Sequence, residues 1–484
     1  MPTDRAERAP RSGLLGAALA LVLVATACAG VDRGTTPSDG TSPGSSVAGE
    51  PRPPLPAGTP GTLGSSPGVV EGLPVPPDLD AAFTGLLEQR ARAVLDGDRA
   101  AFVDTLDGRN ATFLIEQNGY FDNLVQLPLG EFSYEIDPTS LVRSGRSYSV
   151  VVQITTRLDG FDASAARTLD RFRFDRVGGP RARRYVLASV TDRAWEQTYD
   201  IGAQPWETRP IQVRRGAGVL GIFDDASVVD APALMRAMER SIADVAARVP
   251  YPWDRTVVVY ALSDTEFIRS IDDLPGSSPD DLDGIAFTVP AGPGDPTTVA
   301  TRIVLNPRLL ERGGVSRERL LRHELTHVAL GDRDDNAPVW LSEGIAEWVS
   351  VQVLPEEDRR IGVDALAAAR RGVETMPDDE SFNGADATVN YAISWWVCEY
   401  LEKAYGPSAP WNVLDAFAAP GMPESPTIQA LLQISLAKLA KRGTALLVET
   451  YAPTPSPTPS PRPSPRPSAR SGDTPSATPT DDTQ

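Results

Sequence analysis

Both histidines of this 484-residue chain lie within one short segment, His323-Glu-Leu-Thr-His327. In an α-helix, residues four positions apart lie about 40° apart around the axis and about 6 Å apart along it. Both imidazoles can therefore reach one metal ion if the segment is helical, as we predict for a helix from about Ser316 to Leu330. Glu324 lies about 100° from His323, where it can act on a water without being a ligand. This order of ligand, base and ligand is typical of a zinc site.

The two sides of this helix differ in their expected surroundings. Leu321, Leu325, Val328 and Ala329 lie opposite the imidazoles, so we expect one side in the core and the other facing a cleft. Two randomly placed histidines would show this spacing with an intervening glutamate in about one sequence in 5,000. Unrelated surface histidines are therefore a poor explanation. A site that keeps its metal but has lost activity remains an alternative.

A catalytic zinc site needs one more protein ligand. Zinc in such sites has three protein ligands and leaves its fourth position to water. Because the chain has no third histidine, the remaining donor must be a carboxylate. Two glutamates follow in the segment Trp340-Leu-Ser-Glu343-Gly-Ile-Ala-Glu347-Trp348.

The two segments together resemble the gluzincin zinc peptidases of the MA clan. In that family the glutamate before Gly-x-Ala is the third ligand, so the resemblance implies Zn²⁺ bound by His323, His327 and Glu343. Thermolysin-like members place an aspartate four residues after this ligand, where it orients a ligating histidine. Glu347 has that position here, and the resemblance implies that it supports a ligand from the second shell. A solvated helix charge is the alternative for Glu347.

A later apolar helix begins near Asn390 and ends at Gly406. It is similar to the helix that follows the zinc site in the aminopeptidase branch of the gluzincins, where a tyrosine hydrogen-bonds the oxyanion. Tyr391 matches that tyrosine, which implies a catalytic role, and a core aromatic is the alternative. The Gly-x-Met-Glu-Asn element with which those aminopeptidases bind a substrate's amino terminus is not in this sequence. Whether cleavage is internal or terminal is therefore left open.

The N-terminal residues have the features of an export signal. Arginines precede an apolar run at 14–24 that is too short to cross a bilayer as a stable helix. The following Ala25-Thr-Ala-Cys28 resembles a bacterial lipobox, which implies that Cys28 is acylated and binds membrane lipid. We therefore expect residues 1–28 to be a lipoprotein signal peptide, with the protein exported to the outer face of the cytoplasmic membrane. Plain secretion is the alternative.

Two segments have compositions that do not support a packed core. Residues 29–76 are dominated by Gly, Pro, Ser and Thr, and residues 452–484 contain alternating prolines. We expect a disordered tether before the folded part and a disordered tail after it. For the tail, cell-wall association and glycosylation remain open alternatives.

The part between these segments predicts an α+β fold in two domains, with the boundary near 195–205. In 77–200, helical spacing at 79–96 is followed by strand patterns at 131–136, 148–156, 168–174 and 185–190. This order resembles the cone-shaped nuclear-transport-factor-like domains, although a packing or docking module is the alternative.

The second domain is expected at 201–451, where the gluzincin resemblance implies a thermolysin-like mixed sheet followed by mainly helical structure. A helix at 232–248 and strands at 256–262 and 300–305 fit this expectation. If the strand at 300–305 lies at a sheet edge, an extended peptide can pair with it.

Charge excludes one class of partner. Acidic residues outnumber basic residues 65 to 46, and the net charge of −19 repels nucleic acids. We therefore expect an exported, membrane-anchored zinc metallopeptidase that acts on a peptide or protein substrate. The alternative is a surface lipoprotein that binds a ligand or partner while its zinc site is structural or inactive.

Overall fold

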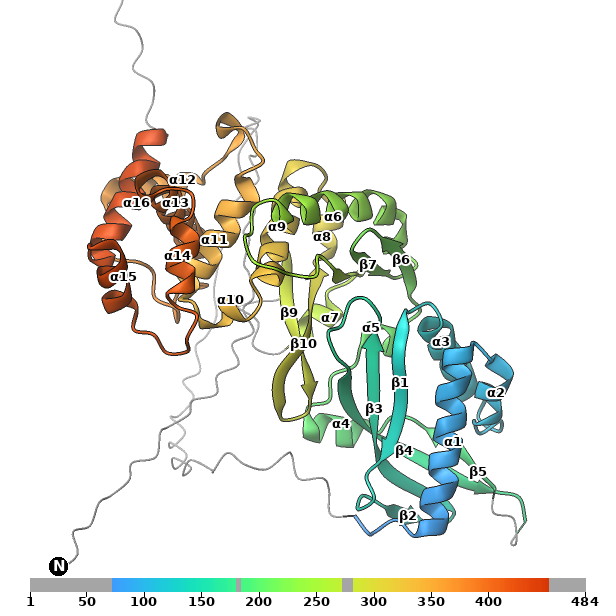
Figure 1. The fold of residues 1–484 in the computed structure, drawn as a ribbon. Helices are drawn as coiled ribbons and strands as arrows, with labels where there is room; N and C mark the ends of the chain where they lie inside the picture. The colour runs from blue at the N-terminus through green and yellow to red at the C-terminus, as the bar shows by residue number, and fades with distance from the viewer. Residues whose placement is uncertain (1–71, 180–183, 272–281, 452–484) are drawn as a thin grey trace, which may run out of the picture.

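The computed structural model describes residues 72–179, 184–271 and 282–451. The expected signal peptide with Cys28, the tether up to residue 71 and the Pro-rich tail lie outside these residues. The described part has a mixed α/β structure with two sheets and a helical C-terminal region (Figure 1). This content of helices and sheets is compatible with the predicted α+β class. No helix within the described ranges is long and apolar enough to span a membrane.

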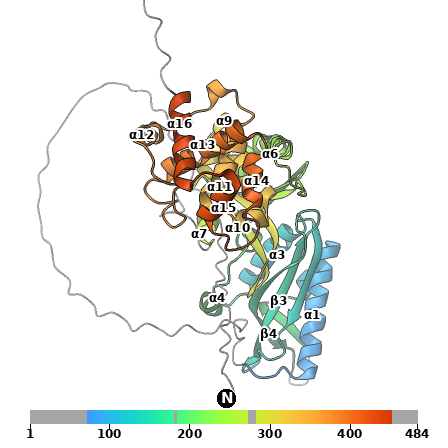
Figure 2. The same cartoon turned by 60° about the vertical axis from the view of Figure 1, so that its left-hand side comes forward.

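The N-terminal unit is a curled antiparallel sheet with helices packed against it. The sheet has the order β1-β3-β4-β5, with β2 paired to β3, and α1 packs against it (Figure 2). Its elements are α1 (Pro77–Asp96), α2 (Arg99–Asp104), α3 (Ala111–Leu124), β1 (Leu129–Ile136), β2 (Val142–Ser144), β3 (Ser147–Leu158), β4 (Ala166–Val177) and β5 (Arg184–Ser189).

Local sequence explains where these helices begin and end. Pro77 starts α1 with a backbone angle already suited to a helix. Gly97 ends it in the left-handed conformation, at φ 68°. The side chains of Asp98 and Asn110 accept backbone N–H groups at the starts of α2 and α3.

A mixed sheet forms the centre of the molecule, with the order β6-β7-β8-β10-β9. The pairs β7-β8 and β8-β10 are parallel, whereas β6-β7 and β10-β9 are antiparallel. Its strands and nearby helices are α4 (Arg193–Tyr199), α5 (Pro205–Thr208), β6 (Gln212–Gly216), β7 (Val219–Phe223), η1 (Ser227–Asp230), α6 (Ala231–Ala246), β8 (Val257–Ala261), α7 (Glu266–Arg269), β9 (Gly284–Gly292) and β10 (Asp295–Leu305).

The sequence left open whether the strand at 300–305 lies at a sheet edge, and the structure shows that it does not. This segment belongs to β10, which lies between β8 and β9 and so has no free edge. The edge strand next to β10 is β9, which the sequence patterns did not predict, and β6 forms the other edge.

Both faces of the central sheet are buried. Side chains alternate along a strand, so Val257 and Val259 of β8 pack in the core formed with the helices, while Val258 and Tyr260 pack toward the N-terminal unit. One continuous hydrophobic core therefore joins the N-terminal sheet to one face of the central sheet.

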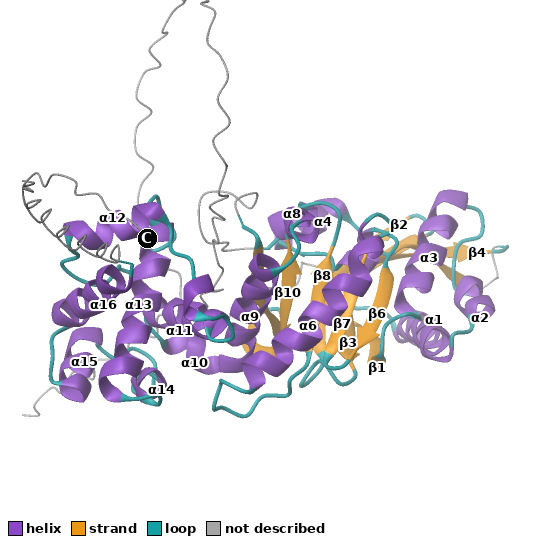
Figure 3. Cartoon of the chain, turned by 90° about the horizontal axis from the view of Figure 1, so that it is seen from above, coloured by secondary structure: helices purple, strands orange, loops and turns teal. Residues whose placement is uncertain are grey.

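Helices cover the other face and form the C-terminal region. Figure 3 shows α6 and α9 on the sheet and the last helices at the opposite end of the molecule from α1. These helices are α8 (Pro307–Glu311), α9 (Val315–Leu330), α10 (Asp332–Asn336), α11 (Val339–Val351), η3 (Glu356–Asp358), α12 (Val363–Arg371), α13 (Ala387–Tyr405), α14 (Ala409–Asp415), α15 (Glu424–Leu432) and α16 (Leu436–Thr450).

Candidate metal centre

Two adjacent helices, α9 and α11, carry the three proposed ligands. Helix α9 begins after Gly314 and ends at Gly331, both of which have positive φ angles that glycine adopts without strain. Helix α11 begins after Pro338, which cannot continue a preceding helix. A Cβ atom on Gly344 would lie 2.7 Å from the carbonyl oxygen of Ser394 in α13, so only glycine permits this close packing beside the third ligand.

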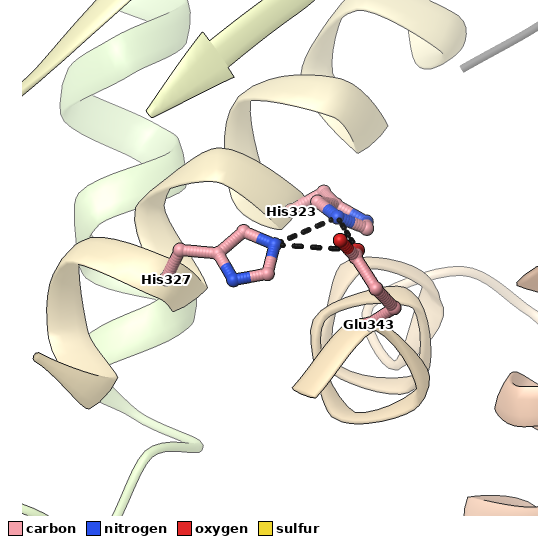
Figure 4. A group of neighbouring side chains, drawn as sticks. All are labelled: His323, His327 and Glu343. Atoms are coloured by element: carbon pink, nitrogen blue, oxygen red, sulfur yellow. Dashed lines mark hydrogen bonds and ion pairs between the residues drawn. The ribbon is translucent and has the colours of Figure 1, made fainter. Parts of the chain in front are cut away.

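The structure brings His323, His327 and Glu343 together in a buried cluster (Figure 4). The Nε2 atoms of the two histidines are 3.0 Å apart, and Glu343 Oε2 lies 3.2 Å from His323 Nε2 and 3.5 Å from His327 Nε2. In a tetrahedral zinc site with ligands at about 2.0 to 2.1 Å, the ligand atoms are about 3.3 to 3.4 Å apart. The three residues therefore fit a zinc ion in both ligand type and spacing.

Glu324 lies beside this cluster and is fully buried. The backbone N–H of Ala286 in β9 donates a hydrogen bond to its Oε2 atom over 2.8 Å. Its Oε1 atom has no hydrogen-bond partner among the described residues and remains able to accept a proton. Burial raises the pKa of Glu324 to about 7, which is suited to a group that takes up and releases a proton near neutral pH.

Glu347 lies behind the first histidine. Its Oε1 atom is 3.2 Å from His323 Nδ1, on the side of the ring that faces away from the other ligands, and it also pairs with Arg319. Burial alone would raise the pKa of Glu347, but Arg319 and His323 lower it to about 2. The carboxylate is therefore ionised and is placed to orient the His323 ring. It is not a solvated helix charge.

The second histidine has a corresponding partner that sequence reasoning missed. Asp334, in the short helix α10, lies with its Oδ2 atom 2.8 Å from His327 Nδ1. The Ser342 hydroxyl donates to the other oxygen of Asp334 over 2.5 Å. The two Asp334 contacts thus tie α10 to both ligand helices. The only sequence signal was an aspartate soon after the histidine pair.

Tyr391, from the first turns of α13, is buried next to the metal centre. Its ring centroid lies 6.4 Å from that of His323, and its hydroxyl donates to Asn383 Oδ1 over 2.9 Å. The tyrosine therefore borders the site that the family resemblance implies. In this conformation its hydroxyl is held by Asn383.

Among the described residues, the cleft expected along α9 is reduced to a small pocket. His323, Glu324 and Glu343 are essentially inaccessible, and His327 is 7% exposed. A pocket of about 40 Å³ lies beside His327, lined also by Ala286 and Asp334. Helix α9 is buried on its polar side as well because Arg322 donates to the carbonyl oxygen of Ser350 and pairs with Asp244.

Comparisons with known proteins identify no family for the chain. No family model matches it, and no curated protein matches it. Among solved structures, native yeast LTA4 hydrolase matches with 11% sequence identity and a TM-score of 0.30, over 67% of this chain and 68% of that chain. A similarity this weak assigns no function. The assignment of the site therefore rests on its own residues and geometry.

Proposed function

We propose that the protein is a zinc-dependent metallopeptidase that hydrolyses peptide bonds in a peptide or protein substrate. The observation that supports this most is the convergence of His323, His327 and Glu343, with the buried Glu324 fixed beside them. A structural zinc site is normally closed by four protein ligands. Within the described part of the chain only these three donors converge, and a carboxylate of raised pKa lies next to them.

The proposed chemistry divides the work between the metal and one side chain. Bound zinc would supply a Lewis acid that polarises the scissile carbonyl and lowers the pKa of water. Glu324 accepts the proton of the attacking water on Oε1 while the Ala286 N–H holds Oε2 in place. The same carboxyl then donates that proton to the leaving amine. Tyr391 donates a hydrogen bond to the developing oxyanion once its hydroxyl leaves Asn383.

The outer edge of β9 before Ala291, whose carbonyl accepts from Arg167 of β4, is the proposed platform for an extended substrate. Among the described strands β9 pairs with β10 alone, and the N–H of its residue Ala286 is directed to Glu324. An extended peptide added to this edge would run directly past the general base.

We also propose export and membrane anchoring through acylated Cys28. The support is the sequence alone, namely the apolar run at 14–24 and the lipobox-like residues that end at Cys28. Substitution Cys28→Ser should move the processed protein from the membrane fraction to the medium, or leave an unprocessed precursor. Retention of a processed Cys28→Ser protein in the membrane fraction would argue against acylation.

The activity itself is tested with Glu324→Gln. Purified wild-type and variant proteins are analysed for zinc and then incubated with an unfolded protein, and the new peptide termini are mapped. We expect both proteins to hold zinc and the variant to cleave about 10²- to 10⁴-fold more slowly, because only the base is removed. Glu311→Gln, at an exposed glutamate outside the site, is the matched control. Equal cleavage by Glu324→Gln would refute the assigned role, and loss of zinc would show that Glu324 is a ligand.

A further inference from the structure

A second and larger cavity lies where the N-terminal unit meets α4 and α5. It has a volume of about 530 Å³ and is lined by residues of α1, α3, α4, α5 and the strands β1, β3 and β4. Cavities of this size hold small organic molecules in other proteins. None of the proposed metal ligands lines it, so it is a separate feature from the metal centre.

Three carboxylates from three different elements meet at this cavity, namely Asp170 of β4, Glu196 of α4 and Glu207 of α5. Each accepts a backbone N–H from a residue near it in sequence. Among the described residues, none of the three forms an ion pair with a basic side chain. The three carboxyl groups therefore line one cavity without an ion-pair partner.

The pKa values reflect this arrangement. Burial raises the pKa of Asp170 to about 8, with a further contribution from the negative charges of Glu196 and Glu207. A bound positive charge would favour the ionised form of all three carboxyl groups.

Arg90 lines another part of the cavity. It is fully buried, and its Nε and Nη2 atoms donate to the Tyr134 hydroxyl and to Gln117. Its Nη1 atom has no hydrogen-bond partner among the described residues. A buried guanidinium without an acidic partner is costly, so this donor favours a ligand that brings its own acceptor.

The same observations decide between classes of ligand. In the part of the chain that the structure describes, only the His323 cluster has three donors close enough to hold one metal ion, so the three cavity carboxylates do not form a metal site. Five carboxylates and two arginines line the cavity, which disfavours an anion. Four aromatic side chains also line the cavity and offer apolar contact that suits an organic molecule but not a hydrated ion. They are Phe113, Tyr120, Tyr134 and Phe172.

We propose that this cavity binds a small organic cation. Its amine or guanidinium group lies between Asp170, Glu196 and Glu207, and a hydrogen-bond acceptor elsewhere on the molecule meets Arg90. The proposal does not depend on hydrolysis at the metal centre, and its test uses no activity readout.

The test is calorimetric titration of the purified full-length protein with agmatine, tyramine and choline, three organic cations of different shape. Tyrosol, which has the size of tyramine but no charge, is the neutral control. We expect at least one cation to bind and, if it is tyramine, tyrosol to bind at least about tenfold more weakly. Absence of binding by all three cations, or equal binding of tyramine and tyrosol, would overturn the proposal.

Variants locate the binding in this cavity. The double substitution Asp170→Asn with Glu207→Gln keeps the shapes of both side chains and should weaken cation binding at least about tenfold. Glu88→Gln, at an exposed glutamate on α1, should leave binding unchanged. Circular dichroism checks that the double variant is folded. Undiminished cation binding by the folded double variant would contradict the proposal, as would calcium binding that this variant abolishes.

Discussion

At the scale of single residues, the two histidines of the metal centre are held by acids from different elements. Glu347 of α11 lies behind His323, and Asp334 of α10 lies behind His327. A carboxylate at Nδ1 fixes the ring and leaves Nε2 directed at the metal position. Each histidine of the proposed metal site thus has a carboxylate neighbour that is not one of the three proposed ligands.

The substitution Asp334→Asn tests this dependence. Loss of the carboxylate should lower zinc affinity about 10- to 100-fold while the overall fold is kept. Competition with a chelator of known affinity measures the effect. Asp332→Asn, at an exposed aspartate two residues earlier, is the control and should bind zinc as the wild type does. Unchanged affinity in Asp334→Asn would show that the contact to His327 is incidental.

Asp170 makes a separate prediction about pH. Its pKa is raised from 3.8 to about 8, so the folded protein binds this proton more tightly than the unfolded chain. The free energy of unfolding should therefore fall as pH rises through this range. Asp170→Asn removes this contribution, so the variant should gain stability relative to the wild type between pH 5 and pH 8, as measured by denaturant unfolding. If the stability difference between the variant and the wild type were the same at pH 5 and at pH 8, the raised pKa of Asp170 would be contradicted.

The sequence predicted which residues come together as proposed ligands more completely than it predicted the carboxylates behind them. His323, Glu324 and His327 follow from helical spacing, and Glu343 follows from a motif with a family resemblance. Asp334 could not be found in this way because its position depends on how the chain turns at Gly331, where φ is 54° and ψ is −136°. Such a turn brings residues together in space that no periodic pattern connects.

At the scale of elements, the packing of α11 against α13 sets the position of the third ligand. Gly344, next to Glu343, lies against the backbone of Ser394.

The predicted helices and strands that carry strong periodicity are present, including 79–96 in α1 and 256–262 in β8. The edge strand β9 was missed, and the polar side of α9 was expected to be exposed. Arg322 of α9 is buried and pairs with Asp244, and Arg319 is half-buried against Glu347, which a hydrophobic pattern does not reveal.

Gly344→Ala tests the helix contact. The added methyl group would lie 2.7 Å from the Ser394 carbonyl oxygen, so the free energy of unfolding should fall by about 1 to 3 kcal/mol. Zinc affinity should fall with it because Glu343 moves. Gly85→Ala in α1, where a Cβ meets nothing within 4 Å, should instead stabilise by about 0.5 to 1 kcal/mol. Urea unfolding measures the stability change of both variants. Equal effects of the two substitutions would contradict the close contact between Gly344 and Ser394.

At the scale of the whole molecule, the N-terminal unit and the central sheet share one core. The hydrophobic cluster runs from Phe83 of α1 to Val304 of β10. A buried ion pair crosses the contact, with Arg302 Nη2 3.3 Å from Asp162 Oδ1. The sequence composition gave no sign of this contact, since strand residues such as Val258 are as apolar as those of any buried strand.

Asp162→Ala should destabilise both parts together. It leaves Arg302 buried without its acid, at a cost of about 3 to 5 kcal/mol. Tryptophan fluorescence and circular dichroism should then report one shared unfolding transition, at lower denaturant concentration than in the wild type. Asp159→Ala breaks an exposed pair with Arg157 and should cost about 1 kcal/mol at most. Two separate transitions would show that the units fold independently.

The central claim is that one zinc ion held by His323, His327 and Glu343 is needed for peptide hydrolysis. The most direct measurement is titration of metal-free protein with zinc while cleavage of an unfolded protein is followed. We predict that the rate rises linearly and levels off at about one zinc per chain, and that Glu343→Ala shows no such rise. Stoichiometric zinc binding without cleavage would contradict the claim and favour a structural or inactive site.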